Sequence, residues 1–280
     1  MSKIKPFVCF CVDGPSDIDA LQIQFEDLFN GKDPNGNYRN DINVSFRFAK
    51  FQKENHGDII SLKDVNADNV QQMIYKFYFK QQDRSSDLGW EDLTYIIHII
   101  DIDGAYVSDE NIHGFNEEEK RLAKELGSRG KSKKALYMGD HIAVKNEFIP
   151  NQESPVQQMC NRNKRKRQII EKLLSLDVLT AKNKEVKYEL YYFSSNLDHF
   201  LYGDANLSGP QKMIKASKFK DDYKDGNKLS EFFSNSEFST NYDYDTSWRA
   251  LRKGNSSLAR GSNVNLLIEK IKNSFVEDWM

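Results

Sequence analysis

The chain has 280 residues, of which 39% are hydrophobic and 12% aromatic, and its 40 basic and 42 acidic residues give a net charge of −2. This length and composition exclude a wholly disordered chain and allow one large domain or a domain with an extension. No apolar run approaches the roughly 18 residues of a membrane span, and the N-terminal residues lack a signal-peptide pattern. Three cysteines are too few for a disulfide framework. We therefore expect a cytoplasmic protein without a membrane partner.

The small net charge hides an asymmetry along the chain. Residues 1–119 contain 11 basic and 22 acidic residues, whereas residues 120–280 contain 29 basic and 20 acidic residues. An acidic half followed by a basic half favours a division of roles between the two parts. Variation of solvated surface charge is the alternative, and charge alone does not decide between the two.

The first predicted unit is a strand, a tight turn and a helix. The apolar residues 6–12 predict a buried strand, in which Cys9 and Cys11 share one face as small core residues. Asp13, Gly14 and Pro15 end this strand. The helix then continues to residue 30, with Ser16 as a candidate N-cap.

The next elements indicate a sheet with helices on both faces. Residues 42–51 alternate as a half-buried strand, residues 66–80 have helical spacing, and residues 94–100 form a second continuous apolar strand. His98 within that strand is expected to be a core histidine. Continuous apolar strands that alternate with helices favour a parallel sheet.

The remaining chain is predicted to be mainly helical. Residues 105–119 are expected to form an acidic loop, and residues 137–144 are expected to form one short strand. A helix, a strand and two further helices are then predicted over 154–175, 186–193, 227–234 and 264–275.

Acidic residues follow both continuous apolar strands. Asp13 and Asp17 follow the first, and Asp101 and Asp103 follow the second. Ligands of open α/β sheets bind beyond the carboxyl ends of the strands, and residues i and i+2 of an extended chain point the same way. Asp101 and Asp103, joined by Asp13 if the sheet places it nearby, therefore predict a site for Mg²⁺ or Mn²⁺. The alternative is that these residues only end strands and cap a helix.

A dense basic stretch predicts contacts with nucleic-acid phosphates. Five of its six residues are cationic, namely Arg162, Lys164, Arg165, Lys166 and Arg167. Such density gives a helix a basic face that attracts a phosphate backbone. An ordinary solvated helix surface is the alternative.

One histidine and one aspartate are further candidates for the site. His199 follows Ser195 and Asn196 and would contact substrate phosphate or transfer a proton if this segment lines the cleft. A helix-surface histidine is the alternative. Asp140, which precedes His141, is a candidate for a further acidic ligand.

The segments VDGPSDIDAL and HIIDIDG together resemble the Toprim fold of topoisomerases, primases and OLD-like and RloB-like nucleases. Asp13 stands where the family usually has Glu, Gly14 and Asp17 are in register, and Asp101 and Asp103 supply the later acidic pair. A further segment, YYFSSNLDHF, is similar to the strand and Ser-Asn segment of RloB-like proteins. The resemblance implies an α/β fold with a Rossmann-like, mainly parallel sheet flanked by helices. A Toprim-like catalytic domain would cover 1–150, and a basic, mainly helical extension that packs on the sheet would cover 151–280.

The resemblance also implies metal-dependent cleavage of DNA or RNA, tRNA included, in anti-phage defence. In that family Mg²⁺ or Mn²⁺ would be held by Asp101, Asp103 and Asp13, while Asp13 and Asp17 would take part in catalysis. The sequence has no Walker motif, which argues against ATP hydrolysis by this chain. The resemblance implies a separate ATPase as a partner beside the nucleic acid. Formation of a homo-oligomer stays open.

Two other functions compete with a nuclease. The segment DIDGAYVSD is similar to the D-x-D-G motif of haloacid-dehalogenase-like phosphatases, although that motif normally opens their fold. A non-catalytic module that binds nucleic acid or protein on a degenerate Toprim scaffold is the third candidate. It is considered because Asp13 is one methylene shorter than the usual Glu.

Overall fold

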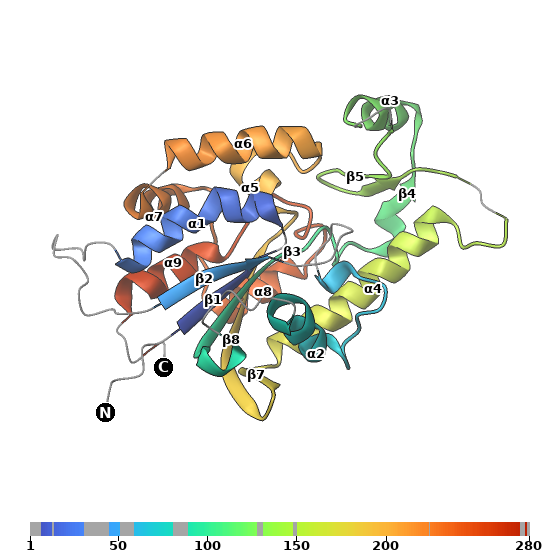
Figure 1. Ribbon diagram of the computed structural model, residues 1–280. Coiled ribbons are helices and arrows are strands. Elements are labelled where there is room, and N and C mark those ends of the chain that lie inside the picture. The colour runs from blue at the N-terminus through green and yellow to red at the C-terminus, as the bar shows by residue number, and fades with distance from the viewer. Residues whose placement is uncertain are drawn as a thin grey trace, which may run out of the picture.

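Two mixed β-sheets flanked by helices form an α/β fold (Figure 1). The computed structural model describes residues 7–12, 14–30, 45–50, 59–80, 89–127, 131–147, 150–223, 225–274 and 278, with the backbone alone for 45–50. The α/β class expected from the sequence is confirmed, with sheets that are mixed rather than wholly parallel.

The larger sheet has the strand order β2-β1-β3-β8-β7. Its strands are β1 (Phe7–Val12), β2 (Ser45–Lys50), β3 (Tyr95–Asp101), β7 (Val178–Ala181) and β8 (Lys184–Phe193). The first four in spatial order are parallel, and β7 is an antiparallel edge strand. The chain passes from β1 to β2 and then returns to the other side of β1 as β3. The winding therefore reverses between β1 and β3, which is where open α/β sheets bind ligands.

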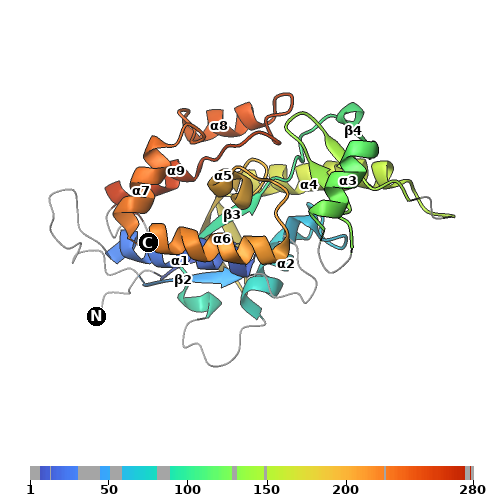
Figure 2. The same ribbon diagram turned by 90° about the horizontal axis from the view of Figure 1, so that it is seen from above.

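Five helices cover one face of this sheet (Figures 1 and 2). They are α1 (Pro15–Asn30), α5 (Leu197–Tyr202), α6 (Gly209–Asp222), α7 (Gly226–Asn235) and α9 (Val264–Asn273). The strand β1 turns Val8, Phe10 and Val12 to this face, where Phe10 contacts Phe25 and Phe29 of α1. Alternation along a strand buried on both sides explains why β1 has no polar residue.

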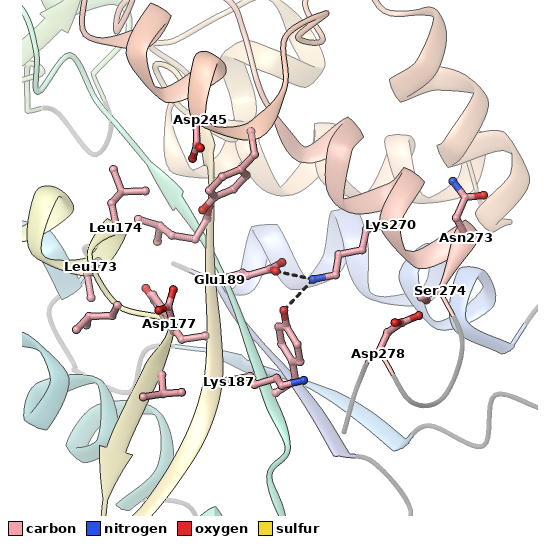
Figure 3. Close-up of a pocket in the computed structure, with 16 residues that line it drawn as sticks. Leu173, Leu174, Asp177, Lys187, Glu189, Asp245, Lys270, Asn273, Ser274 and Asp278 are labelled. Carbon is pink, nitrogen blue, oxygen red and sulfur yellow. Dashed lines mark hydrogen bonds and ion pairs between the residues drawn. The ribbon is translucent and has the colours of Figure 1, made fainter.

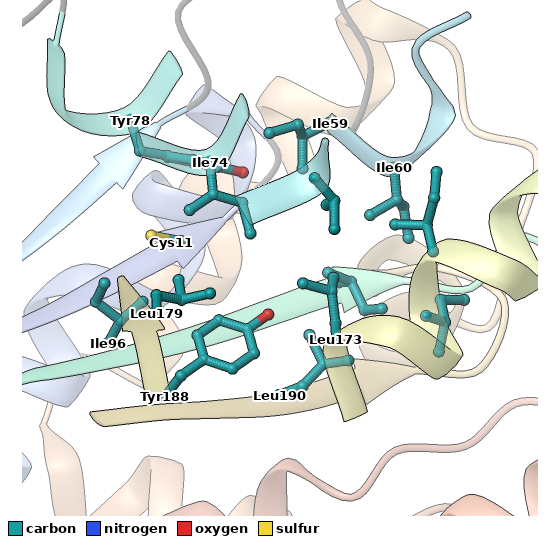
Figure 4. Packing of buried hydrophobic residues seen from close by; sticks show 14 of the residues in the cluster. Cys11, Ile59, Ile60, Ile74, Tyr78, Ile96, Leu173, Leu179, Tyr188 and Leu190 are labelled. Atoms are coloured by element: carbon teal, nitrogen blue, oxygen red, sulfur yellow. The ribbon is translucent and has the colours of Figure 1, made fainter. Parts of the chain in front are cut away.

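The opposite face packs against α2 (Val70–Ile74), a π-helical turn (Tyr75–Lys80), α4 (Pro155–Leu174) and α8 (Tyr244–Leu251). Figure 4 shows Cys11, Ile96 and Leu173 within this second core. Short 3₁₀ helices at Ile59–Ser61, Trp90–Asp92 and Asp109–Asn111 connect the elements. Cys9 and Cys11 are buried on this face as core residues, as the sequence predicts.

A second, three-stranded sheet has the order β4-β6-β5, from β4 (Ile112–Gly114), β5 (Ala135–Tyr137) and β6 (Ile142–Val144). The helix α3 (Glu117–Glu125) packs against it through Ala123. Gly104, just beyond β3, lies so close to Ile142 that a Cβ there would be 2.8 Å from its side chain. The small sheet therefore adjoins the carboxyl end of β3.

The predicted main strands and the helices near 16–30, 154–175, 227–234 and 264–275 are confirmed within a few residues. Two expectations for the small sheet are wrong. Residues 105–119 are not only a loop, since they contain β4 and the start of α3. Residues 137–144 hold parts of two strands, because a turn closed by the amide of Met138 and the carbonyl of His141 divides them.

The predicted domain boundary at residue 150 stays a prediction. The strands β7 and β8 of the later part belong to the same sheet as β1, β2 and β3. Among the helices that the structure describes, none is both long and apolar enough to cross a membrane.

Candidate active site at the carboxyl ends of the central strands

Carboxylates from three segments meet beyond the carboxyl ends of β3 and β8. Asp101 is the last residue of β3, Asp17 lies in the first turn of α1, and Asp198 lies in the first turn of α5. Each acts electrostatically on at least one of the others. Asp13, the predicted ligand after β1, lies outside the described residues.

The start of α1 positions Asp17. Its Oδ2 accepts a hydrogen bond of 2.9 Å from the backbone N–H of Gly14, and the Ser16 hydroxyl is 3.4 Å from its Oδ1. Asp17 lines a small cavity with Asp101 and with apolar side chains of the core, including Leu21 and Phe193. Burial raises the pKa of Asp17 from 3.8 to about 6, and the Asp198 charge adds to this, while the Gly14 hydrogen bond and Lys212 oppose it.

The charged form of Asp101 is also disfavoured in the folded protein. Its Oδ1 accepts a hydrogen bond of 2.9 Å from the backbone N–H of Leu197. Burial raises the pKa of Asp101 well above its usual value, and the charges of Asp17 and Asp103 raise it further. The acidic pair of Asp17 and Asp101 is thus short of positive charge, which a divalent cation would supply.

Asp17→Asn is expected to change how stability depends on pH. Because the pKa of Asp17 is raised in the folded protein, its contribution is fully present below pH 3.8 and is lost as pH rises through about 6. The variant should therefore melt a few degrees above the wild type at pH 7.5, in the absence of divalent cations, and at nearly the same temperature at pH 4. Thermal unfolding at both pH values checks this. An equal difference at the two pH values would show that the Asp17 charge is not the cause.

Asp198 and Lys212 of α6 form an ion pair that completes this cluster. Although burial lowers the pKa of Lys212, the charges of Asp198, Asp101 and Asp17 raise it above its usual value. Lys212 is thus a cation held beside three carboxylates. The sequence did not predict Asp198 or Lys212 as site residues. Asp198 lies in the segment YYFSSNLDHF, in which His199 was the candidate, whereas Lys212 stands in no motif, and only the fold brings both to β3.

Asp103 has different partners from Asp101. Its Oδ2 accepts hydrogen bonds from Arg162 at 3.0 Å and Lys166 at 3.1 Å. Burial raises the pKa of Asp103, but the charges of Lys166 and Arg162 outweigh it and hold the pKa below the usual value. Asp101 and Asp103 were expected to point the same way along an extended chain. The strand instead ends at Asp101, and Asp103 has a left-handed backbone with φ of 49°. Metal binding by Asp103 stays a prediction.

The basic stretch of α4 is divided between the interior and solvent. Lys166 is 0% exposed and paired with Asp103, so the expectation of one exposed basic face is wrong for this residue. Arg162 is half-buried, and the Arg167 guanidinium donates to the carbonyl of Val107. Lys164 is exposed and Arg165 half-buried. A role of this stretch in binding nucleic acid stays a prediction.

His98 and His199, the two histidines for which the sequence predicted a role, lie in different surroundings. His98 is a fully buried core residue, as expected, and its Nδ1 is 2.9 Å from the Tyr188 hydroxyl. His199 is half-buried in α5, and burial and the Arg260 charge lower its pKa. The charges that act on its ring come from Arg260 and Asp204, not from the acidic cluster, and its catalytic role stays a prediction.

Another pocket lies near the amino end of β3, away from Asp101. Figure 3 shows Glu189, Lys270 and Asp177 among its lining residues. Lys270 forms an ion pair with Glu189 and donates to the Tyr95 hydroxyl at 2.8 Å. The central charges of this pocket are therefore already paired with one another, which makes it a weaker candidate for chemistry than the acidic cluster.

One group of residues could hold a metal ion with three ligands, among the residues that the structure describes. It consists of His113, Glu119 and His141 in the small sheet and α3, with one ligand atom of each within 4.8 Å of the others. The sequence drew attention only to His141 and its neighbour Asp140. No spacing motif links His113 and Glu119 to it.

The chain was also compared with known proteins. No protein-family model, no curated protein and no solved structure matches it. The function proposed below therefore rests on no relative.

Proposed function

We propose that the protein is a Toprim-like, metal-dependent nuclease that cleaves phosphodiester bonds in DNA or RNA, with tRNA among the candidate substrates. The observation that supports this most is the half-buried acidic pair of Asp17 and Asp101 at the reversal of the sheet's winding. Asp101 of this pair belongs to the segment HIIDIDG, which is one of the segments that carry the Toprim resemblance. Anti-phage defence, a separate ATPase partner and action in the cytoplasm belong to the same proposal.

The donor set fits Mg²⁺ or Mn²⁺. Both ions prefer carboxylate oxygens. Burial raises the pKa of Asp17 and of Asp101, and the charges of neighbouring carboxylates raise both further, which a cation would relieve. Asp101 would hold the metal, with Asp103 and Asp13 as the other ligands that the motif implies. The bound metal would stabilise the charge that develops on the phosphoryl oxygens.

The side chains around the pair can serve the remaining steps. A carboxylate with a pKa of about 6 can accept a proton near neutral pH, so Asp17 suits the role of general base toward an attacking water. Arg162 and Lys212 are ion-paired with Asp103 and Asp198, and a substrate phosphate would share their positive charge with these carboxylates. Exposed Lys164 would add a salt-dependent contact with the nucleic-acid backbone.

Cleavage of labelled DNA and total RNA with Mg²⁺ or Mn²⁺ tests the proposal. Asp101→Asn should reduce the rate by about a hundredfold or more and abolish the calorimetric signal of Mg²⁺ binding. The exposed Asp68→Asn makes the same chemical change outside the site and should behave as the wild type.

Salt-sensitive nucleic-acid binding without cleavage, together with Mg²⁺ binding that is equal in wild type and Asp101→Asn, would overturn the proposal. That outcome would instead favour the non-catalytic binding module. Cleavage that persists in Asp101→Asn would place the chemistry elsewhere in the molecule.

A further inference from the structure

The small sheet brings two histidines to the same face. His113 lies in β4 opposite Ala143 of β6, and His141 stands two residues before Ala143. His141 lies one residue before β6, so the stacking of the two rings rather than strand alternation places both imidazoles on one side of the sheet. Their rings are stacked, with centroids 4.5 Å apart and an angle of 28° between the planes.

The helix α3 adds a carboxylate in a fixed orientation. Glu119 is 5% exposed and belongs to a capping box, in which its Oε2 accepts a hydrogen bond of 2.7 Å from the backbone N–H of Asn116. Its Oε1 lies 2.8 Å from Nε2 of His141. One oxygen of Glu119 therefore anchors the helix start, while the other faces the histidines.

In both imidazoles, Nδ1 lies within hydrogen-bond distance of an oxygen acceptor. Nδ1 of His141 is 2.6 Å from a carboxylate oxygen of Asp140, and Nδ1 of His113 is 3.1 Å from the carbonyl oxygen of Gly114. Metal-binding histidines are commonly held in this way, because an acceptor at one nitrogen leaves the other unprotonated for the metal. Asp140, a candidate ligand in the sequence, thus has the geometry of a residue that orients a ligand.

We propose that His113, Glu119 and His141 form a binding site for a divalent transition-metal ion, with Zn²⁺ as the best match. Two imidazoles and one carboxylate are a ligand set of zinc sites that keep a fourth position open for water or substrate. Among the first-row metals compatible with such ligands, Zn²⁺ binds more tightly than Mn²⁺ or Fe²⁺. This site is separate from the acidic cluster of the proposed nuclease and does not depend on it.

The spacing of the three groups suits a metal after a small adjustment. Ligand atoms about 2.0–2.1 Å from a tetrahedral zinc lie roughly 3.3 Å from one another. The ligand atoms here are within 4.8 Å of one another, and His113 is exposed, so its ring can move toward the other two. An ion pair of His141 with Glu119 would account for those two side chains, but it gives no role to the stacked His113.

Calorimetric titration of the tag-free, chelator-treated chain with Zn²⁺ tests the site. We expect one Zn²⁺ per chain, with affinity at least tenfold weaker in His113→Ala and His141→Ala and about tenfold weaker in Asp140→Asn. Glu118→Gln is the matched control for Asp140→Asn, because it also replaces an exposed carboxylate by an amide, next to Glu119 in the same helix turn. Asp101→Asn should retain this zinc, so the two sites are distinguishable.

Co²⁺ provides a second readout that does not depend on activity. The wild type with Co²⁺ should show the visible absorption of a four- or five-coordinate ion, and His113→Ala should lose it. Since His113 is exposed, this variant is expected to fold, which circular dichroism verifies. Zinc affinity that is unchanged in both histidine variants, or absence of stoichiometric zinc in the wild type, would overturn the proposal. Tighter binding of Mg²⁺ or Mn²⁺ than of Zn²⁺ at these residues would also contradict it.

Discussion

Lys166→Met is expected to lower the free energy of unfolding by about 3 kcal/mol, which is the low end of the cost of breaking a buried ion pair. Lys166 is 0% exposed and lies 3.1 Å from the Asp103 carboxylate. Methionine fills a similar volume, so the loss would come from the charge rather than from a cavity. Arg162 remains beside Asp103 at 3.0 Å, and for this reason we do not expect the full cost of an unpaired carboxylate.

Urea unfolding of three variants isolates this pair. Lys164→Met makes the same substitution at an exposed position of the same helix and should change stability by less than about 0.5 kcal/mol. In the Asp103→Asn/Lys166→Met double variant the remaining carboxylate is also removed, and much of the stability should return. If Lys166→Met is as stable as Lys164→Met, the ion pair makes no net contribution to folding.

The main sheet could be predicted because its strands are continuous apolar runs. The segments 7–12 and 95–100 are buried on both faces in the structure, so every residue in them had to be apolar or, like His98, paired in the core. The small sheet could not be predicted in this way. Its strands have three residues each, which is too short to show a period of two, and contacts with α3 and α4 stabilise them.

The candidate site was predictable only where it follows strand ends. Asp101 and Asp17 could be found because acidic residues after buried strands lie at the edge where ligands bind. The partners that determine their electrostatics could not. Lys212 and Asp198 lie on helices far along the chain from Asp101. The orientation of Asp103 depends on its own left-handed backbone and on its ion pair with Lys166 of α4. Such contacts are properties of the fold rather than of any local pattern.

Acid should destabilise the wild type through His98. Burial lowers the pKa of His98 from 6.5 to about 3, so the folded protein keeps this ring neutral while the unfolded chain protonates it. The stability that it contributes is present above pH 6.5 and is lost as pH falls toward 3. Between pH 7 and pH 4 this amounts to about 3 kcal/mol, since each pH unit between the two pKa values is worth about 1.4 kcal/mol.

A double variant separates this effect from the carboxylates that titrate in the same range. His98→Leu/Tyr188→Phe removes the ring together with its partner, so the Tyr188 hydroxyl is not left without its bond to His98. Urea unfolding at pH 7, 5.5 and 4 should show that the double variant loses about 3 kcal/mol less than the wild type over this range. Tyr188→Phe alone is the control and should keep the acid sensitivity of the wild type. Equal losses in the double variant and the wild type would mean that the pKa of His98 is the same in the folded and unfolded protein, because only then does its removal leave the pH dependence unchanged.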